Sequence, residues 1–317
     1  MPELTLMAYN IRHMNRMFEN ERVEDGAADR AAAIAEVIDR VDPHLIGISE
    51  AANADAEHRD FIDRFLGGRF RVASGRSRGA QNLVYYVRDP LEVESIDEEI
   101  DYYEPFNVDV DSDGVMERVR WERKPLEAVF RVGGTRIRAI LAHTKSKGVF
   151  DVVDLAGFEK ISLGNRKKLI AQADRLRERI EGFLRAEDPI PTVVLGDLND
   201  GPGIDAFEQF LGRSFVETAM GSVFAPREIL HNVLHHLSTT SAGRRELYTA
   251  DFPDPIVNNP LGYRHRVWID HILLSPDLLE EGAAVRYVPG SGAIDAKDRA
   301  SYEASDHFAV VCRLEVD

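Results

Sequence analysis

The sequence has a single cysteine and no long hydrophobic run. Because Cys312 stands alone among 317 residues, no disulfide can form within the chain, and a reducing compartment is the simpler expectation. The sequence contains no run of 18 apolar residues, and no basic region precedes the first expected strand. We therefore expect neither a membrane span nor a signal peptide in the sequence as given, and a cytoplasmic location. A leader ahead of Met1 would leave secretion open.

The sequence also has fewer basic than acidic residues. Lysine and arginine number 39 against 55 aspartate and glutamate residues, which gives a formal net charge of −16. This balance disfavours a broad basic surface that grips nucleic acid through its phosphates alone. It does not exclude a nuclease, because bound metal ions can reverse the field of an acidic cleft.

The length and composition allow one large α/β domain or two ordinary ones. Hydrophobic residues make up 44% of the chain, enough for a sizeable core, and no repeat or low-complexity linker divides it. We therefore expect a single domain over residues 1–317, and a monomer. Alternating and buried-run patterns predict strands, and apolar residues at helical spacing predict helices. The expected strands are 4–9, 45–48, 83–88, 126–132, 135–142, 192–195, 269–274, 285–288 and 308–314, and the expected helices are 27–41 and 166–184. Hairpins and strand–helix–strand units together favour a mixed-sheet α/β sandwich with outer helices.

Two segments differ in charge from the rest. Residues 92–117 hold eleven acidic residues and no basic one. The run Asp109-x-Asp111-x-Asp113-Gly resembles the start of a calcium loop, but its twelfth position is Arg120, so we favour a solvated acidic hairpin tip.

Residues 213–267 have the opposite character, with six arginines and four histidines, and we expect a long loop segment there. Within it, His231 and His235 lie four residues apart, as zinc ligands on a helix do. Without a His-Glu-x-x-His motif we interpret them as an ordinary helix face.

The strongest functional signal is a set of polar residues at strand ends. The run from Val193 to Leu195 continues through Gly196 into Asp197, Asn199 and Asp200. Alone, such a run is also typical of a turn that caps itself. Similar groups follow or precede other expected strands: Asn10, Glu50, His143 with Lys145, Asp270, and Asp306 with His307. Hard oxygen ligands of this kind suit Mg²⁺, Mn²⁺ or Ca²⁺, and hydrolysis of a phosphoester needs a metal, a base and a group that stabilises the developing charge.

In order and spacing these segments resemble the motifs of the endonuclease/exonuclease/phosphatase superfamily, the deoxyribonuclease I-like metal-dependent phosphoesterases. The similarity runs from residue 7 to residue 308. The resembling segments are Met7-Ala-Tyr-Asn-Ile-Arg12, Asp42-Pro-His-Leu-Ile-Gly-Ile-Ser-Glu50, Ile140-Leu-Ala-His-Thr-Lys-Ser-Lys-Gly148, Gly196-Asp-Leu-Asn-Asp200, Trp268-Ile-Asp-His-Ile-Leu-Leu-Ser275 and Ser305-Asp-His307. The resemblance implies a four-layer α/β sandwich, with two packed mixed β-sheets flanked by helices.

The resemblance also implies roles for single residues. Glu50 would be the principal metal ligand, with Asn10 and Asp306 close by. Asp197 and Asn199 would lie beneath the scissile phosphate, where Asp197 would also hold a metal or the attacking water.

Three further residues would act on the reacting groups. His307 would be the general base or a phosphate contact, oriented by Asp270 through its second ring nitrogen. His143 would stabilise the phosphate or protonate the leaving oxygen.

Two basic residues complete the implied site. Arg123 resembles a phosphate-clamping arginine, although a plain surface arginine stays open, and Lys145 would contact the substrate or be an exposed strand-end lysine.

The chain departs from the family pattern at a few positions. Ser49 stands where Gln is usual, His44 replaces a common Asp, and Gln81 or Asn82 lies where nuclease relatives can carry a Glu that supports the acid histidine. None of these changes removes a core catalytic group.

We therefore expect a divalent-metal-dependent phosphodiesterase, with a nuclease acting on DNA or RNA favoured. The alternative is a phosphatase or phospholipase C-like enzyme for a small phosphoester, of the inositol phosphate or sphingomyelin type. A catalytically silent binding module is a further alternative, against which the complete residue set argues.

Overall fold

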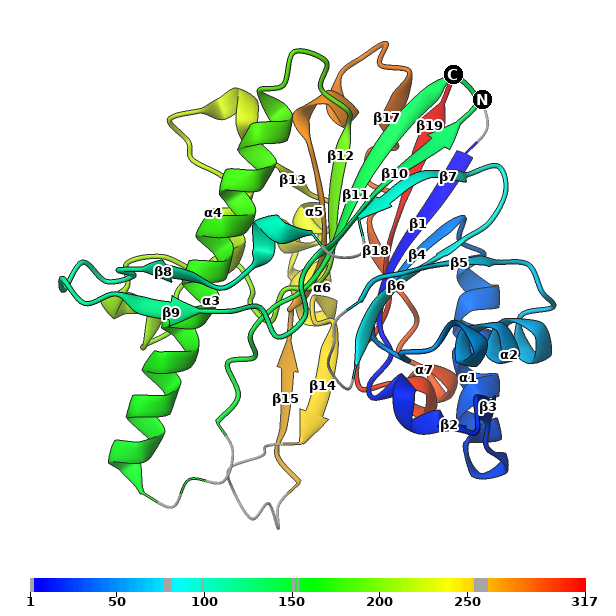
Figure 1. Ribbon diagram of the computed structural model, residues 1–317, viewed down its shortest axis with the longest axis horizontal. Coiled ribbons are helices and arrows are strands. Elements are labelled where there is room, and N and C mark those ends of the chain that lie inside the picture. Colours follow the sequence, from blue (N-terminus) through cyan, green and yellow to red (C-terminus); the bar gives the residue numbers. More distant parts are fainter. Residues whose placement is uncertain (1–2, 77–80, 98–99, 150–151, 153, 254–261) are drawn as a thin grey trace.

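The computed structural model describes residues 3–76, 81–97, 100–149, 152, 154–253 and 262–317. Two large mixed β-sheets form its centre (Figure 1). The first has the order β17 (Val285–Tyr287), β19 (Val310–Val316), β1 (Glu3–Asn10), β4 (Leu45–Ala51), β6 (Asn82–Val87) and β5 (Arg71–Ser74), with β18 (Ala293–Ile294) also pairing β19. The second has the order β13 (His231–Asn232), β16 (Asp270–Leu274), β12 (Thr192–Asp197), β11 (Thr135–His143), β10 (Leu126–Val132) and β7 (Glu92–Asp97).

Each large sheet contains one parallel pair. These pairs are β1 with β4 and β11 with β12, whereas the other strand neighbours are antiparallel. Three small two-stranded sheets add β2 (Phe18–Glu19) with β3 (Arg22–Val23), β8 (Phe106–Val108) with β9 (Glu117–Val119), and β14 (Ala250–Pro253) with β15 (Arg264–Val267).

The two large sheets pack face to face through a shared core. Because side chains alternate along a strand, Leu4, Leu6 and Ala8 of β1 point into this core while Met7 and Tyr9 point to the other face. The second sheet contributes buried residues to the same core, namely Leu126, Ala128, Phe130, Leu141, Val193, Leu195, Ile272 and Leu274. This common core is what joins the two sheets.

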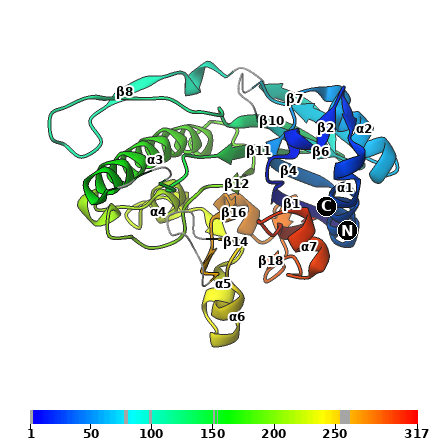
Figure 2. The same cartoon turned by 90° about the horizontal axis from the view of Figure 1, so that it is seen from below.

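Helices cover the outer face of each sheet. On one side lie α1 (Ala28–Val41), α2 (Asp55–Phe65) and α7 (Arg299–Ala304), and on the other lie α3 (Leu155–Leu184) and α4 (Phe215–Met220) (Figures 1 and 2). Ile34 and Phe61 pack against the first sheet, and Leu169 and Leu176 pack against the second. The short helices α5 (His235–Ser238) and α6 (Ser241–Glu246) lie apart, at the bottom of Figure 2. The expected four-layer α/β sandwich is therefore confirmed.

The expected strands and helices are present, with shifts at their ends. The strand expected over 126–132 is β10, and the helix expected over 27–41 is α1. The helix expected over 166–184 begins earlier, at Leu155, where the Asp154 carboxylate accepts a hydrogen bond from the Gly157 amide and caps it. A local side-chain cap therefore starts the helix ahead of its periodic part.

The arginine-rich segment 213–267 is not one long loop. Outside residues 254–261, which the structure does not describe, it contains α4, α5, α6 and strands β13, β14 and β15. His231 lies on β13 and His235 begins α5, so the two do not share a helix face.

The acidic segment 92–117 forms strand β7 and most of the β8–β9 hairpin, apart from residues 98–99, which lie outside the described residues. At the hairpin tip Lys167 of α3 forms ion pairs with Asp111 and Glu117, at 2.7 and 2.6 Å. A lysine from a packed helix therefore compensates part of its charge.

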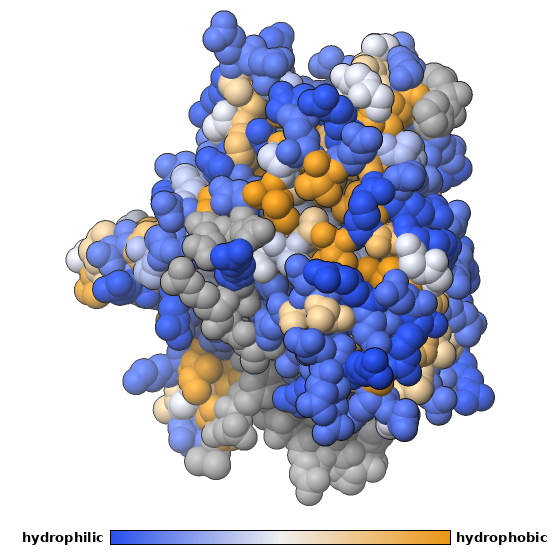
Figure 3. Space-filling model, turned by 45° about the vertical axis from the view of Figure 1, so that its right-hand side comes forward, coloured by the Kyte–Doolittle hydropathy of each residue, from blue (hydrophilic) through white to orange (hydrophobic). Residues whose placement is uncertain are grey.

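Hydrophilic residues cover most of the face shown in Figure 3, with hydrophobic areas near its middle. No helix of the described chain is long and apolar enough to cross a membrane.

One buried histidine under the first sheet makes stability depend on pH. His58 of α2 bonds the Tyr86 hydroxyl through Nδ1, at 2.8 Å, and the Ala52 carbonyl through Nε2, at 3.1 Å. Burial lowers the pKa of His58 to about 4, whereas an unfolded histidine titrates near its ordinary value of 6.5. Below pH 6.5 the unfolded chain therefore binds a proton that the native chain does not, and the folded state loses stability as the pH falls towards 4.

We compare the free energy of unfolding of wild type with that of His58→Gln. The difference between them, in favour of wild type, should become smaller by about 2 kcal/mol between pH 7 and pH 5. Urea unfolding of both proteins across this range measures it. His235→Gln, at an exposed position, is the control. A difference that stays constant with pH would show that His58 is protonated equally in both states.

Candidate active site

The polar strand ends of the two sheets meet at one edge of the sandwich. Because β11 and β12 are parallel and β16 runs the other way, His143, Asp197 and Asp270 lie side by side in register. In the first sheet the parallel pair β1 and β4 brings Asn10 opposite Ser49, next to Glu50. Sheet topology therefore gathers residues that are up to several hundred positions apart in the chain.

A buried carboxylate–imidazole pair lies at the centre of this edge. Asp270 Oδ2 and His307 Nδ1 are 2.8 Å apart, and both side chains are almost fully buried. The Asp270 amide donates to the hydroxyl of Thr249, at 2.9 Å, which fixes the start of β16. Since Nδ1 is engaged by a carboxylate, the ring presents Nε2 to the reacting groups.

Burial alone would lower the pKa of His307, but the charge and hydrogen bond of Asp270, together with Asp197 and Asp306, outweigh it and raise the pKa to about 10. The imidazole is therefore positively charged at neutral pH as long as these carboxylates carry uncompensated charge.

Asp197 is the second buried acid of the site. Its Oδ2 accepts from the Asn10 side chain at 2.9 Å, and its Oδ1 accepts from the Asn199 amide at 2.9 Å. Burial, followed by the charge of Asp270, raises the pKa of Asp197 to about 7. Acidic and imidazole ligand atoms of Asp197, Asp270 and His307 all lie within 4.8 Å of one another. Because Asp197 and Asp270 both lie close to the same imidazole, its positive charge offsets only part of their combined negative charge.

The backbone before Asp197 requires glycine. Gly196 has φ of 126°, and an added Cβ would lie 2.2 Å from the Ala142 carbonyl oxygen on the neighbouring strand. Two positions after Asp197, Asn199 adopts a left-handed conformation with φ of 50° and donates to the Thr144 carbonyl at 3.1 Å. Strained or glycine-dependent backbone on both sides therefore fixes where Asp197 points.

Glu50 also occupies a left-handed backbone position, with φ of 58°, where the pairing of β4 with β6 is irregular. Its Oε2 accepts from the His13 amide at 2.8 Å, and it is also bonded by the Gln81 side chain. A glutamate held in a conformation that costs free energy is typical of a functional position.

Ser305 ties the last motif to the first. Its hydroxyl donates to the Asn10 carbonyl at 2.7 Å and accepts from the Arg12 amide at 3.1 Å. The next residue, Asp306, lies 3.4 Å from the guanidinium of Arg12. These contacts bring Asp306 to the end of β1, beside Asn10.

The oxygen atoms of this group fit a divalent cation. Asn10 Oδ1 and Asp306 Oδ1 are buried and have no hydrogen-bond partner among the described residues. Buried polar oxygens are normally satisfied, and carboxylate and amide oxygens are the ligands that Mg²⁺ and Ca²⁺ prefer. Glu50, Asn10, Asp306 and Asp197 therefore supply a donor set of the right chemistry.

His143 and Arg123 form the opposite wall. His143 Nε2 lies 3.3 Å from Arg123 Nη2 and 3.5 Å from Asp197 Oδ2. Burial, then the charges of Arg123 and His307, lowers the pKa of His143 well below its ordinary value. His143 is therefore neutral, and its Nδ1 is buried without a partner in the described structure. Arg123 is held in place by Gln81 Oε1, which accepts from it at 2.6 Å.

A cavity of about 580 Å³ exposes these groups to a substrate. Most of the residues expected from the sequence line it together: Glu50, Arg123, His143, Asp197, Asn199, Asp306 and His307. Asn10 and Asp270 do not line the cavity themselves, but each is hydrogen-bonded to a residue that does: Asn10 to Asp197, and Asp270 to His307.

Lys145 is placed differently from the other expected residues. Its ammonium lies 3.3 Å from Glu122, and it lines a separate cavity with Arg118 and Arg120. Its neighbour Lys147 lines the main cavity but forms ion pairs with Asp200 and with Glu208, the latter at 2.6 Å.

The sequence reading missed several residues of the cavity wall. Arg12 and His13 follow Asn10 directly, and the Asn-Ile-Arg run was a signal that pointed to Arg12. Phe252 and Val267 come from the β14–β15 hairpin. Two backbone hydrogen bonds link this hairpin to the site: the Phe308 amide donates to the Thr249 carbonyl, and the Asp251 amide donates to the Asp306 carbonyl. Nothing in the sequence pattern of that hairpin indicates its position.

Comparison with known proteins identifies the family. The model of the Endonuclease/Exonuclease/phosphatase family matches residues 7–307. A comparison with curated proteins finds no match. Among solved structures, TDP2 from C. elegans has a TM-score of 0.58 at 14% identity, with 98% of this chain and 75% of that chain covered.

Two further structures are similar over almost their whole length. D. rerio TDP2 complexed with a single-strand DNA product has a TM-score of 0.57 at 14% identity, covering 99% of both chains. The human Nocturnin catalytic domain with a bound sulfate anion has a TM-score of 0.52 at 14% identity, covering 99% of this chain and 95% of that chain. These likenesses show the fold. Since the family match spans nearly the whole chain, this protein belongs to the Endonuclease/Exonuclease/phosphatase family.

Proposed function

We propose that this protein is a divalent-metal-dependent phosphodiesterase that cleaves nucleic acid. The observation that carries the proposal is the buried Asp270–His307 pair at 2.8 Å, set beside Asp197 in a cavity that Arg123 also lines. An oriented imidazole, a cluster of oxygen ligands and a guanidinium are the three kinds of group that phosphoester hydrolysis needs.

The proposed metal ligands are Glu50, Asn10, Asp306 and Asp197. A bound divalent cation would supply charge that offsets the non-bridging phosphate oxygens. The donor set contains no thiolate, because the only cysteine, Cys312, is buried elsewhere in β19. Hard cations such as Mg²⁺, Mn²⁺ or Ca²⁺ match these ligands.

His307 can act as a base only when the surrounding negative charge is compensated. With Asp197 and Asp306 ionised, its raised pKa makes it a proton donor at neutral pH. Compensation of those carboxylates lowers that pKa and leaves Nε2 free to accept a proton from water, while Asp270 keeps the ring oriented. Asp270 is therefore proposed to be a positioning residue and His307 the group that moves the proton.

Arg123 and His143 are proposed to bind the phosphate. The planar guanidinium of Arg123 matches two phosphate oxygens, and Gln81 holds it in that orientation. A neutral His143 carries a single ring N–H, which can donate one hydrogen bond to a phosphate oxygen. Of the two roles considered for it, contact with a phosphate oxygen fits its lowered pKa better than protonation of the leaving group. Asn199 lines the same cavity as Arg123 and His143.

The preference for nucleic acid rests on the arginines that line the main cavity, Arg12 and Arg123, and on two solved structures that are similar to this chain. The structure of D. rerio TDP2 holds single-strand DNA, and that of human Nocturnin holds a sulfate anion. A phosphatase or phospholipase C-like reaction on a small phosphoester is the second candidate, favoured by the net charge of −16, because a small substrate needs only a local pocket.

A substrate panel tests the proposal. Purified protein with Mg²⁺ or Mn²⁺ is offered single- and double-stranded DNA, RNA, a generic phosphodiester, a phosphomonoester and sphingomyelin. We expect polynucleotide and phosphodiester hydrolysis that EDTA abolishes and added Mg²⁺ or Mn²⁺ restores. Turnover that survives exhaustive chelation would contradict the metal mechanism. Hydrolysis of the monoester or sphingomyelin alone would favour the second candidate.

A further inference from the structure

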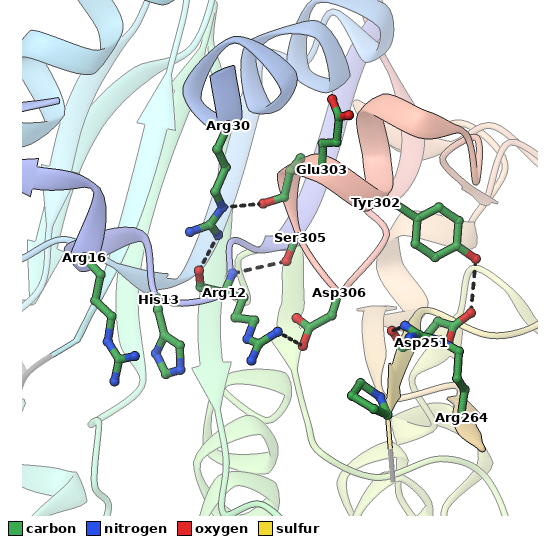
Figure 4. A pocket seen from close by; sticks show the side chains of 12 residues that line it. Arg12, His13, Arg16, Arg30, Asp251, Arg264, Tyr302, Glu303, Ser305 and Asp306 are labelled. Atoms are coloured by element: carbon green, nitrogen blue, oxygen red, sulfur yellow. Dashed lines mark hydrogen bonds and ion pairs between the residues drawn. The ribbon is translucent and has the colours of Figure 1, made fainter. Parts of the chain in front are cut away.

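A second cavity adjoins the candidate active site. It has a volume of about 450 Å³ and shares Arg12, His13, Pro253 and Asp306 with the main cavity. Figure 4 shows its walls. Arg12, His13 and Arg16 project from the segment after β1, Arg30 comes from α1, and Arg264 with Asp251 comes from the β14–β15 hairpin. A group bound in the main cavity can therefore extend directly into this one.

The positive charge of this cavity is not compensated by its acids. Arg16 is exposed and forms no ion pair within the described structure. Arg30 is half-buried, and among the described residues it donates only to the carbonyls of Ala304 and Arg12, the former at 2.9 Å. Burial accordingly lowers the pKa of Arg30, but a guanidinium stays charged at neutral pH. A partly desolvated cation without a carboxylate partner is costly unless an anion approaches it.

The acidic residues of the wall already have partners. Asp251 accepts from Arg264 and from the Tyr302 hydroxyl, the latter at 3.1 Å. Glu303 pairs with Arg299, at 2.7 Å. Asp306 faces Arg12 and belongs to the proposed metal ligands. Among the described residues, the cations left for a ligand are therefore those of Arg16 and Arg30.

We propose that this second cavity binds a phosphate group next to the one that is cleaved. The inference rests on the proposed function, because the scissile phosphate must occupy the main cavity. A guanidinium group can bind two phosphate oxygens at once, and the two that remain at this cavity match a phosphate better than a neutral sugar or a base. The preferred substrate then carries at least two successive phosphates, as a polynucleotide does and a simple phosphodiester does not.

The test compares ligands that differ by one phosphate. Three thymidine dinucleotides are used: one with the internal phosphate only, one with an added 5′-phosphate and one with an added 3′-phosphate. Their dissociation constants are measured by calorimetry with Mg²⁺ present, in a His307→Ala background that prevents turnover. We expect one of the two added phosphates to tighten binding by about tenfold, a change worth about 1.4 kcal/mol, and its position shows on which side of the scissile phosphate the cavity lies.

Substitution of the arginines then assigns the effect to the cavity. Arg16→Gln and Arg30→Gln should bring the ratio of the two dissociation constants close to one. Arg30 also bonds two backbone carbonyls, so the exposed Arg16 gives the result least affected by folding. Arg245→Gln, at an exposed position on α6 outside both cavity walls, is the matched control and should keep the ratio.

Two results would overturn the inference. One is that neither added phosphate improves binding in the parent protein. The other is that the improvement survives both Arg16→Gln and Arg30→Gln. Because these constants are measured without turnover, they are independent of catalysis. Failure of wild type to hydrolyse any phosphodiester would reject the proposed function and leave the binding comparison valid.

Discussion

Replacing His307 with alanine should slow phosphodiester hydrolysis by about 10²- to 10⁴-fold in kcat, because a positioned proton-transfer group contributes on that order. The imidazole lies 2.8 Å from Asp270, close to Asp197, and lines the main cavity. Its loss removes the group proposed to accept the proton of water and leaves Asp270 buried without its partner. Steady-state kinetics on a generic phosphodiester measure the effect.

A double-mutant cycle separates the role of Asp270 from that of His307. Asp270→Asn keeps the size of the side chain but removes the charge that, with the hydrogen bond, raises the pKa of His307. If Asp270 acts through the ring, the double variant Asp270→Asn/His307→Ala should be little slower than His307→Ala alone, since residues that act as a unit are non-additive. Additive losses would show that the two residues work separately.

His58→Gln provides the matched control for this cycle. His58 is also buried and hydrogen-bonded through both ring nitrogens, but it belongs to α2 and lies outside the cavity walls. Its substitution should lower stability while leaving kcat at the wild-type level. A comparable loss of kcat would mean that any buried histidine disturbs the site through folding.

Glu50→Gln should lower kcat by about 10²-fold or more and raise the Mg²⁺ concentration needed for half-maximal activity. The substitution removes a negative charge from the proposed ligands but keeps the side chain able to bond Gln81 and the His13 amide. Activity measured over a range of Mg²⁺ concentrations gives both values, and calorimetric titration with Mg²⁺ gives the change in metal affinity directly.

Glu36→Gln, at an exposed position on α1, is the control for charge alone. It removes the same charge from the protein at a distance from the cavity and should change neither value. If Glu50→Gln keeps the wild-type Mg²⁺ affinity, Glu50 is not a metal ligand. Its left-handed backbone would then need another explanation.

The sequence predicted the polar strand ends well because each is a local pattern. A buried β-branched run must end where polar residues begin, so Asp197 and Glu50 could be placed at strand ends from their neighbours alone. The order of the motifs along the chain then pointed to the family, which the match over residues 7–307 confirms. The catalytic and metal-binding roles of the single residues stay predictions.

Long-range placement was harder to foresee. No sequence pattern indicated that Arg16 and Arg30 lie beside Asp306, because these residues belong to a short 3-10 helix, to α1 and to a motif far along the chain. The expected loop at 213–267 failed for a related reason. Short elements such as β14, β15 and α6 have too few residues to show a periodic pattern, and they form because they pack and pair within the fold.

By itself the sequence determined the elements and the chemistry of their ends, since hydrophobic period and polar residue type are local properties of the chain. The tertiary structure decided which charges are compensated. It paired Arg213 with Asp174 and Arg264 with Asp251, yet within the described part of the chain it left Arg16 and Arg30 without a carboxylate partner beside the cavity. Compensation depends on distances of a few ångströms between residues that are remote in sequence, so only the packed sheets and the segments at their edge could fix it.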